Sequence, residues 1–176
     1  ADMVALVRDG PDDTGGIAYL LSNPTNYPVV SATATAAYSV NNYCASGCES
    51  IFAHELGHNM GNAHDPATIA YDNGGTFLPT AGVFTYSFGH YDCANGLTCN
   101  PFTPGSGCNN LISPLPERPE CLNKTANDFG TIMSYFFPVV MKFSNPNVFC
   151  KPDTQGATSP GRACGTADHD NSLSMN

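Results

Sequence analysis

Three histidines and a glutamate lie close together in the run His54-Glu55-Leu56-Gly57-His58-Asn59-Met60-Gly61-Asn62-Ala63-His64. If this run is helical, His54 and His58 are one turn apart and their imidazoles project from the same face. Two imidazoles placed in this way can bind one tetrahedral zinc ion. Glu55 projects about 100° further around the helix axis. It can therefore act on a water molecule at the metal without being a ligand.

Gly61 predicts how a third histidine reaches the same metal. Glycine adopts positive φ angles at little cost, so the chain can leave the helix there through a sharp turn. That turn brings His64 back toward the other two histidines. Three neutral histidines leave the fourth zinc position for water, which is typical of catalytic rather than structural zinc sites. His90 and His169 lack such a context, and we predict structural or surface roles for them.

A helix that carries this motif is predicted over residues 51–60. Ser46 and Glu49 have the spacing of a capping box, which satisfies backbone N–H groups at the start of a helix. Gly61 and Asn62 follow as a helix stop. One face of this helix is apolar, because side chains four residues apart repeat along it: Phe52, Leu56 and Met60.

Short apolar runs bounded by turn-forming residues predict the strands around that helix. We expect a buried strand at residues 3–7 and two further strands at 17–21 and 33–40. After residue 62, regular patterns are scarce. A short helix, an apolar turn-bounded segment and a closing helix are expected at residues 122–128, 129–135 and 167–175.

Length and charge exclude several classes of protein. The chain has 176 residues, enough for one domain with a buried core. Lys plus Arg number 6 and Asp plus Glu number 15, which gives a formal net charge of −9. A protein that binds nucleic acid or an anionic membrane surface through basic side chains needs the opposite balance. The longest apolar run has five residues, far fewer than the roughly 18 that a membrane helix needs.

The eight cysteines predict disulfide bonds and a secreted protein. No pair has the Cys-x-x-Cys spacing of zinc ribbons or thioredoxin-type sites. Local pairing is expected, in the pairs Cys44–Cys48 and Cys150–Cys164. Two further bridges are expected among Cys93, Cys99, Cys108 and Cys121. The chain begins at Ala1 without a leader-like segment, so we expect a processed form or a fragment.

The run from His54 to His64 fits the pattern HExxHxxGxxH and resembles the zinc signature of the metzincin metallopeptidases. Metzincins also have a tight methionine turn beneath the zinc site, and residues 130–135, with Met133, look like that turn. The two motifs occur in the expected order, which makes the resemblance specific. It implies that Met133 supports the histidine ligands from below and takes no part in the chemistry.

Other residues are similar to particular groups of metzincins. Asp65, directly after the third histidine, resembles the adamalysin/reprolysin and snapalysin groups. Tyr135 is instead similar to the astacins and serralysins. The tail, with residues 143–148, Ala167-Asp168 and Asn171, looks like bacterial reprolysin-like enzymes of the peptidyl-Asp metalloendopeptidase kind.

The resemblance implies an α/β (α+β) fold of metzincin type in a single catalytic domain, residues 1–176. An N-terminal lobe, residues 1–61, would contain a twisted mixed sheet and the active-site helix. A C-terminal lobe, residues 62–176, would be irregular and stapled by disulfides. Metzincin domains usually have another strand and a long helix before the position of residues 3–7, and we expect these to be absent or very short.

The resemblance also implies a reaction, the hydrolysis of peptide bonds in protein substrates by a zinc endopeptidase. Glu55 would act as the general base, and Tyr135 would stabilise the oxyanion. Asp65 would make a structural hydrogen bond to the second lobe. An extended peptide would pair with the edge strand at Ile17, Ala18 and Tyr19.

Specificity is only weakly indicated. Residues 136–144 follow the methionine turn and would line the primed-side pocket. Lys142 lies in this segment and is one of only six basic residues. A cation in the pocket would favour an acidic substrate side chain, whereas a lysine that faces solvent is the simpler interpretation.

Two functions of other classes remain open. One is an inactive metzincin-like module that contains zinc and binds peptides without cleaving them. The other is a zinc hydrolase that acts on a non-peptide substrate. The intact Glu55 favours catalysis over a binding module. In either case we expect a monomer with no nucleic-acid or membrane partner.

Calcium is a second candidate cofactor. Asp9, Asp12 and Asp13 form one acidic loop, and Asp65 and Asp72 lie in another. Neither loop matches an EF-hand pattern. Solvated acidic loops are the simpler interpretation.

Overall fold

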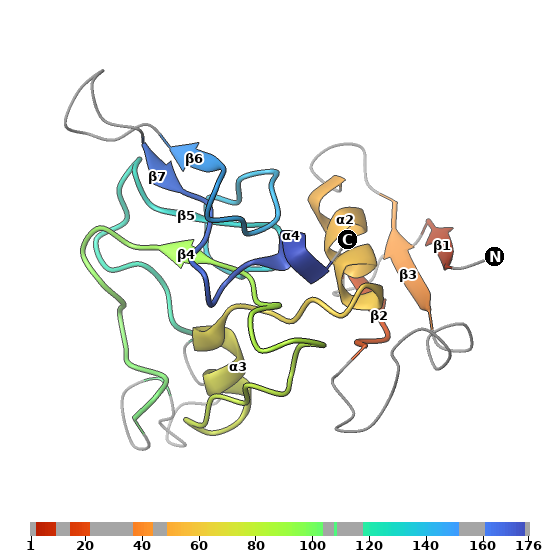
Figure 1. Cartoon of the computed structure of the whole chain (residues 1–176), viewed down its shortest axis with the longest axis horizontal. Helices are drawn as coiled ribbons and strands as arrows, with labels where there is room; N and C mark the ends of the chain where they lie inside the picture. The colour runs from red at the N-terminus through yellow and green to blue at the C-terminus, as the bar shows by residue number, and fades with distance from the viewer. Residues whose placement is uncertain are drawn as a thin grey trace.

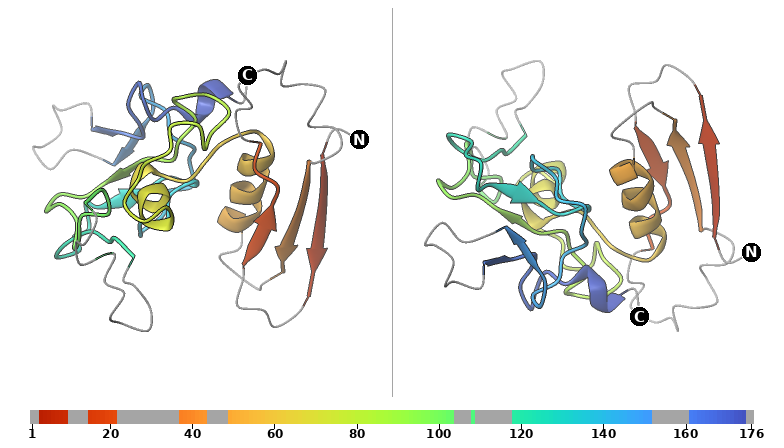
Figure 2. Two further views of the ribbon diagram at one scale, coloured as in Figure 1. Left: turned by 90° about the horizontal axis from the view of Figure 1, so that it is seen from below. Right: turned by 90° about the horizontal axis from the view of Figure 1, so that it is seen from above.

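The computed structural model describes residues 3–9, 15–21, 37–43, 49–103, 108, 118–151 and 161–174. These residues form two parts, a sheet together with the helix that carries the histidine motif, and a loop-rich part on the other side of that helix (Figures 1 and 2). We call residues 3–60 the sheet lobe and residues 61–174 the irregular lobe. No helix in the described residues has the length and apolar character needed to cross a bilayer.

The sheet lobe contains three strands, β1 (Val4–Arg8), β2 (Gly16–Ala18) and β3 (Tyr38–Asn42). Their order is β1-β3-β2, with β1 parallel and β2 antiparallel to β3. The predicted mixed sheet is therefore confirmed, and β2 lies at one of its edges. The third strand starts at Tyr38 rather than at residue 33, and residues 33–36 lie outside the described part of the chain.

The prediction that the first strand is buried is wrong. All five residues of β1 are exposed, including Leu6 at 57%. The physical reason is its position, because β1 is the outer edge strand and pairs only with β3. The helix covers β2 and β3 instead (Figure 2).

The helix predicted at residues 51–60 is confirmed as α2 (Glu49–Asn59). Ser46 of the predicted capping box lies outside the described residues. The apolar face is not the buried face, since Phe52 is 41% exposed, whereas Glu55 and Asn59 are buried. The Asn59 side chain donates hydrogen bonds to two backbone carbonyls, that of Tyr19, just after β2, at 2.9 Å and that of Tyr38 in β3 at 3.2 Å.

The irregular lobe begins with a helix that sequence patterns did not predict, α3 (Pro66–Asp72). Asp65 caps its N-terminus by accepting from the backbone N–H of Thr68, and Pro66 occupies the first turn. An N-cap aspartate followed by proline is a helix-start signal, so the sequence did contain this information.

Little other regular structure occurs in the described part of this lobe. Strands β4 (Tyr91–Asp92) and β5 (Phe129–Gly130) pair antiparallel, as do β6 (Phe149–Lys151) and β7 (Arg162–Ala163). The chain then reaches the short helix α4 (Asn171–Ser174). Its course is shown in Figure 1.

Both helices predicted in this lobe need correction. Residues 122–128 form turns because the Asp128 carboxylate accepts from the backbone N–H groups of Ala94 and Thr125 and closes a loop. The closing helix is α4 alone. Ahead of it, Thr166 and His169 pair through backbone hydrogen bonds in a turn, which prevents a helix from starting at residue 167.

Three disulfides join the described cysteines, in the pairs Cys93–Cys121, Cys99–Cys108 and Cys150–Cys164. The predicted Cys150–Cys164 pair and the two bridges among the middle four cysteines are confirmed. Cys44 and Cys48 lie outside the described residues, so their pairing stays a prediction.

The buried apolar side chains are unevenly distributed between the lobes. In the described sheet lobe, Ala37 is the buried apolar residue. The irregular lobe contributes the remainder of the core: Ala63, Ala67, Ile69, Ala70, Val83, Phe88, Cys108, Cys121, Phe129, Ile132, Met133, Phe136 and Cys164. The core therefore lies where regular secondary structure is scarce.

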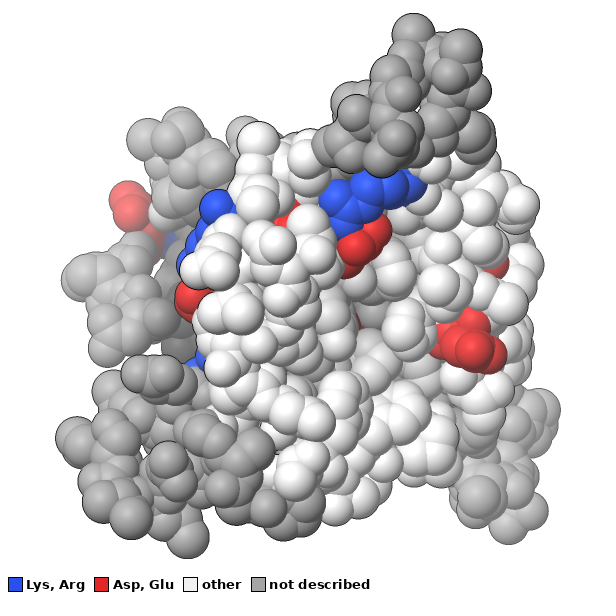
Figure 3. All heavy atoms as spheres, turned by 90° about the vertical axis from the view of Figure 1, so that its left-hand side faces the viewer, with Lys and Arg blue, Asp and Glu red and all other residues white. Residues whose placement is uncertain are grey.

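Charged groups are sparse on the face of the irregular lobe that Figure 3 shows, where some basic and acidic atoms lie side by side and one acidic group stands apart. Arg162 forms an ion pair with Asp92 and also donates to the carbonyl of Asn127. These contacts join β7 to β4 and to the loop before β5. Lys124 pairs with Glu120 at 2.7 Å, with both side chains exposed.

Candidate metal centre and substrate cleft

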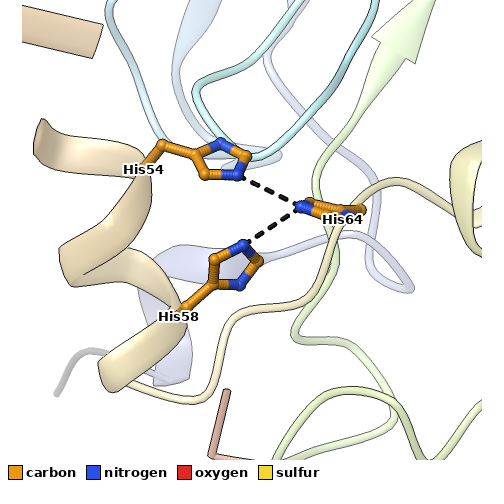
Figure 4. A group of neighbouring side chains, drawn as sticks. All are labelled: His54, His58 and His64. Atoms are coloured by element: carbon orange, nitrogen blue, oxygen red, sulfur yellow. Dashed lines mark hydrogen bonds between the residues drawn. The ribbon is translucent and has the colours of Figure 1, made fainter. Parts of the chain in front are cut away.

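The three histidines of the motif converge at the junction of the two lobes (Figure 4). His54 and His58 come from successive turns of α2, and His64 comes from the segment that follows. The Nε2 atom of His64 lies 3.1 Å from that of His54 and 3.0 Å from that of His58. Gly61 makes this possible, because its φ of +86° turns the chain sharply after the helix.

Backbone carbonyls determine which nitrogen of two of these rings carries the proton. The Nδ1 atom of His54 lies 2.7 Å from the carbonyl oxygen of Ile132, and Nδ1 of His58 lies 2.9 Å from that of Asn62. A carbonyl oxygen can only accept, so each Nδ1 must be the donor. Each Nε2 then presents a lone pair toward the centre of the group.

This donor set fits zinc. A tetrahedral ion with Zn–N bonds of about 2.0–2.1 Å holds its nitrogen ligands about 3.3–3.4 Å apart, close to the distances found here. Among the described residues, these three histidines are the group of His, Cys, Asp and Glu side chains that could hold a metal. Imidazole nitrogens suit zinc and not calcium, which takes oxygen ligands.

Burial keeps the three imidazoles neutral, as metal ligands must be. It lowers the pKa of His54 and lowers the pKa of His58 to about 4, with the charge of His54 adding to the effect on His58. For His64, burial first and the neighbouring histidines second bring the pKa well below its usual value.

Glu55 lies beside the histidines and is only 5% exposed. Burial raises the pKa of its carboxyl group to about 7. Gly16 of β2 faces it so closely that a Cβ atom at that position would lie 2.7 Å from Glu55 Oε1. A side chain at residue 16 would therefore displace the carboxylate.

The predicted methionine turn lies under the histidine motif. Met133 is fully buried, and its side chain faces Gly57 of α2. A Cβ atom at Gly57 would collide with Met133 Sδ and would lie 2.9 Å from Phe143 Cε1. Glycine at this position thus lets the turn approach the helix.

Asp65 connects α3 to the methionine turn. Besides capping α3, its carboxylate accepts from the Thr68 hydroxyl at 2.8 Å, the Ser134 hydroxyl at 3.1 Å and the Tyr135 backbone N–H at 3.2 Å. The side chain is fully buried, and burial raises its pKa although these hydrogen bonds oppose the shift. Because its oxygens are engaged with these donors, Asp65 gives no support to a calcium site with Asp72. Asp12 and Asp13 of the other acidic loop lie outside the described residues.

The Tyr135 ring packs against two of the three histidines. Its ring centroid lies 4.6 Å from that of His64 and 5.7 Å from that of His54, edge to face in both cases. The Arg118 guanidinium lies 4.6 Å from the Tyr135 ring centroid and 5.9 Å from that of Tyr71. Burial raises the pKa of the Tyr135 phenol, and the Arg118 charge opposes that shift.

A cleft of about 320 Å³ opens beside Glu55 and between the two lobes. It is lined by Gly15, Gly16, Ser50, Ile51, His54, Glu55, Ile132, Ser134, Tyr135, Phe137 and Val139. Ile17, Ala18 and Tyr19 continue from the Gly16 rim but line a separate groove on the sheet with Tyr38, Ser39 and Val40. The structure thus places β2 at the rim of the cleft.

Lys142 is not among the residues that line the cleft. Its ammonium group donates to the carbonyl oxygen of Phe149 at 2.7 Å, on the surface of the irregular lobe. The acidic-pocket hypothesis for Lys142 therefore gains no support, and the exposed position agrees with the simpler interpretation.

His90 and His169 form a second histidine pair, with their Nδ1 atoms 3.3 Å apart. Both rings are half-buried, and the His90 ring also lies against Phe129. Burial lowers the pKa of His90 to about 4 and also lowers that of His169. In the described residues this pair has no third metal-binding side chain within reach.

Three residues near the metal centre were not identified from the sequence. Gly16 matters because Glu55 packs against it, and Gly57 matters because Met133 does. No local sequence pattern indicates such contacts. Arg118 is distant from the motif in the chain and carries no signal beyond its charge. Gly57 lies within the motif itself, whereas only the folded chain brings Gly16, Met133 and Arg118 to it.

A reprolysin-type model of metallo-peptidase family M12 matches residues 1–138. The comparisons with curated proteins and with solved structures returned no match.

Proposed function

Since this chain belongs to metallopeptidase family M12, we propose that it is a zinc-dependent endopeptidase that hydrolyses peptide bonds of protein substrates. The observation that carries the proposal is the convergence of three Nε2 atoms beside a buried glutamate at the edge of an open cleft. The metzincin resemblance of the motif agrees with this family.

The proposed chemistry divides between the metal and the chain. His54, His58 and His64 would hold a zinc ion, which when bound would supply Lewis acidity to a substrate carbonyl and to water. Glu55 takes the proton of the attacking water and passes it to the leaving amine. The buried position of Glu55, with Gly16 packed against it, fixes the direction of its carboxylate.

Other residues position or assist these groups. The Tyr135 ring is close enough to the ligands for its hydroxyl to stabilise the oxyanion, a contribution typically of about 3–4 kcal/mol. Met133 supports the histidines from below, and Asp65 holds the Tyr135 backbone through its N–H. Ile132 and Asn62 orient His54 and His58 through their carbonyl oxygens.

The substrate is proposed to be an extended polypeptide. The strand β2 lies at an edge of the sheet and at the rim of the cleft, so a peptide can add to it as a further strand near Ile17, Ala18 and Tyr19. Apolar side chains predominate on the far wall, among them Ile132, Phe137 and Val139. The three disulfides support secretion.

Zinc analysis combined with a peptide-cleavage assay tests this function. Glu55→Gln should retain about one zinc per chain but lose activity by about 10²–10⁴-fold, because only proton transfer is removed. Glu120→Gln changes an exposed carboxylate and is the matched control. A chelator should abolish wild-type activity, and added zinc should restore it.

Three outcomes would contradict the proposal. Full activity of Glu55→Gln would show that Glu55 is not the general base. Stoichiometric zinc together with tight peptide binding but no cleavage by the wild type would favour the inactive binding module. Cleavage of a non-peptide ester or amide library, with all peptides left intact, would favour the other hydrolase.

A further inference from the structure

The C-terminal segment of the chain contacts the residues that join His58 to His64. Helix α4 lies beside the end of α2, where the histidine motif turns (Figures 1 and 2). Its first residue, Asn171, is fully buried although its side chain is polar. The family model matches only residues 1–138, so this segment lies outside the matched part.

Asn171 makes hydrogen bonds in two directions. Its side-chain amide donates to Oδ1 of Asn62 at 3.1 Å, and its backbone N–H donates to the Ser144 hydroxyl oxygen at 2.8 Å. Ser144 Oγ also lies 2.6 Å from the Phe88 carbonyl oxygen and 2.8 Å from Asn171 Oδ1, and shares its one proton between them. Ser144 and Asn62 are fully buried too, so water cannot replace these partners.

Asn62 links these hydrogen bonds to the metal ligand His58. Its backbone carbonyl accepts from Nδ1 of His58 at 2.9 Å, and its backbone N–H donates to the Gly57 carbonyl at 2.9 Å. A shift of Asn62 therefore moves the carbonyl that orients His58. The next residue, Ala63, leads to His64 and is hydrogen-bonded to Ser87 and Gly89.

We propose that Asn171 is a positioning residue for the metal ligand His58 and acts through Asn62. The inference rests on the proposed function only in that His58 binds zinc. Groups that orient a histidine ligand typically change metal affinity by about 10–100-fold when they are lost. Asn171 acts one residue further out, so about tenfold is expected. Asn62 and Asn171 are 109 positions apart in sequence, and both would help to orient His58.

Zinc affinity, measured by competition with a chromophoric chelator, tests the proposal without any activity assay. Asn171→Ala should bind zinc about tenfold more weakly than wild type, and the visible spectrum of the Co²⁺-loaded protein should shift because His58 is less constrained. Leu173→Ala changes an exposed residue of the same helix and should behave as wild type. Phe129→Leu loosens the core next to the His90 ring and controls for lower stability.

A double-mutant cycle identifies the route. Asn62→Ala removes the same contact from the other side but keeps the backbone carbonyl that binds His58, so it should also weaken zinc binding about tenfold. If both residues act through one contact, the double variant should bind no more weakly than either single variant. Asn62→Ala also provides the test if Asn171→Ala does not fold.

Three results would overturn the inference. One is wild-type zinc affinity in a folded Asn171→Ala or Asn62→Ala protein. The second is fully additive losses in the double variant. The third is an equal loss of affinity in Phe129→Leu, which would reduce the effect to general stability. A wild type that binds zinc but cleaves no peptide would refute the proposed function and leave this inference untouched.

Discussion

The sheet lobe and the irregular lobe stabilise themselves in different ways. The sheet lobe has the regular hydrogen bonding of three strands and α2, yet every residue of β1 is exposed. The irregular lobe has short strands and loops, yet it contains nearly all of the buried apolar side chains among the described residues. Regular secondary structure and a hydrophobic core are therefore separate features of this molecule.

Buried polar side chains explain how the irregular lobe can have a core. A buried backbone N–H or C=O group needs a partner, and helices and sheets normally supply it. Here Asp65, Asp128 and Ser144 supply it, because each is fully buried and hydrogen-bonded to main-chain groups of distant segments. Both lobes contribute to the metal centre, but the irregular lobe holds it in place.

The largest expected effect contrasts one core residue with one strand residue. Phe88→Ala should lower the free energy of unfolding by about 3–5 kcal/mol, because Phe88 is buried and packs with Ala63, Ile69 and Phe77. Leu6→Ala in the exposed strand β1 should change it by no more than about 0.5 kcal/mol. Urea unfolding of both variants measures the difference. Equal losses would erase the contrast between the lobes.

Asp65→Ala tests whether a polar side chain holds the irregular lobe together. The variant should lose about 3 kcal/mol of stability, because the donors at Thr68, Ser134 and Tyr135 are left without their acceptor in a buried site. Calorimetry measures the loss. Asp168→Ala is the control, since Asp168 is exposed in the same lobe. A loss below about 1 kcal/mol in Asp65→Ala would contradict this role.

Replacing both Cys150 and Cys164 by serine should cost about 3 kcal/mol or somewhat less. The bridge closes a loop with a sequence separation of 14, and the loss comes mainly from the greater freedom of the unfolded chain. Chemical denaturation under non-reducing conditions measures it. Zinc content should remain unchanged at temperatures where the variant is folded. Loss of zinc from the folded variant would extend the role of this bridge to the metal centre.

The smallest expected effect is a pH dependence from the second histidine pair. Burial lowers the pKa of His90 to about 4 and lowers that of His169, while Asp92 and Arg162 act on His90 and Asp168 acts on His169. In the folded state these groups bind fewer protons than in the unfolded state, where their pKa is about 6.5. Their contribution is therefore complete above about pH 6.5 and is lost as pH falls toward about 4.

Unfolding free energies of the wild type and His90→Asn, measured from pH 7 to pH 4.5, isolate this effect. Titration of groups that do not interact with His90 cancels in the difference between the two proteins, so the difference reports on His90 and its contact with His169. The advantage of the wild type should shrink as the solution is acidified. A difference that is constant over this range would mean that the pKa of His90 is not lowered.

More of the metal centre than of the surrounding fold could be predicted from the sequence. The spacing of His54, His58 and His64, with Gly61 between them, is a local geometric pattern, and the structure brings the three rings together. The exposure of β1 could not be predicted, because an apolar run does not reveal whether another element covers it. The helix expected at residues 122–128 failed for a similar reason, since the Asp128 side chain competes with helical hydrogen bonding.

Local spacing is enough to bring the three imidazoles together, because a helical turn places two of them on one face and a glycine returns the third to them. The surroundings of these imidazoles depend on the tertiary structure. Gly16 against Glu55, Gly57 against Met133 and Asn171 against Asn62 are contacts between segments far apart in the chain. No repeat or spacing specifies such pairs, because they depend on how the two lobes pack rather than on the geometry of any one element.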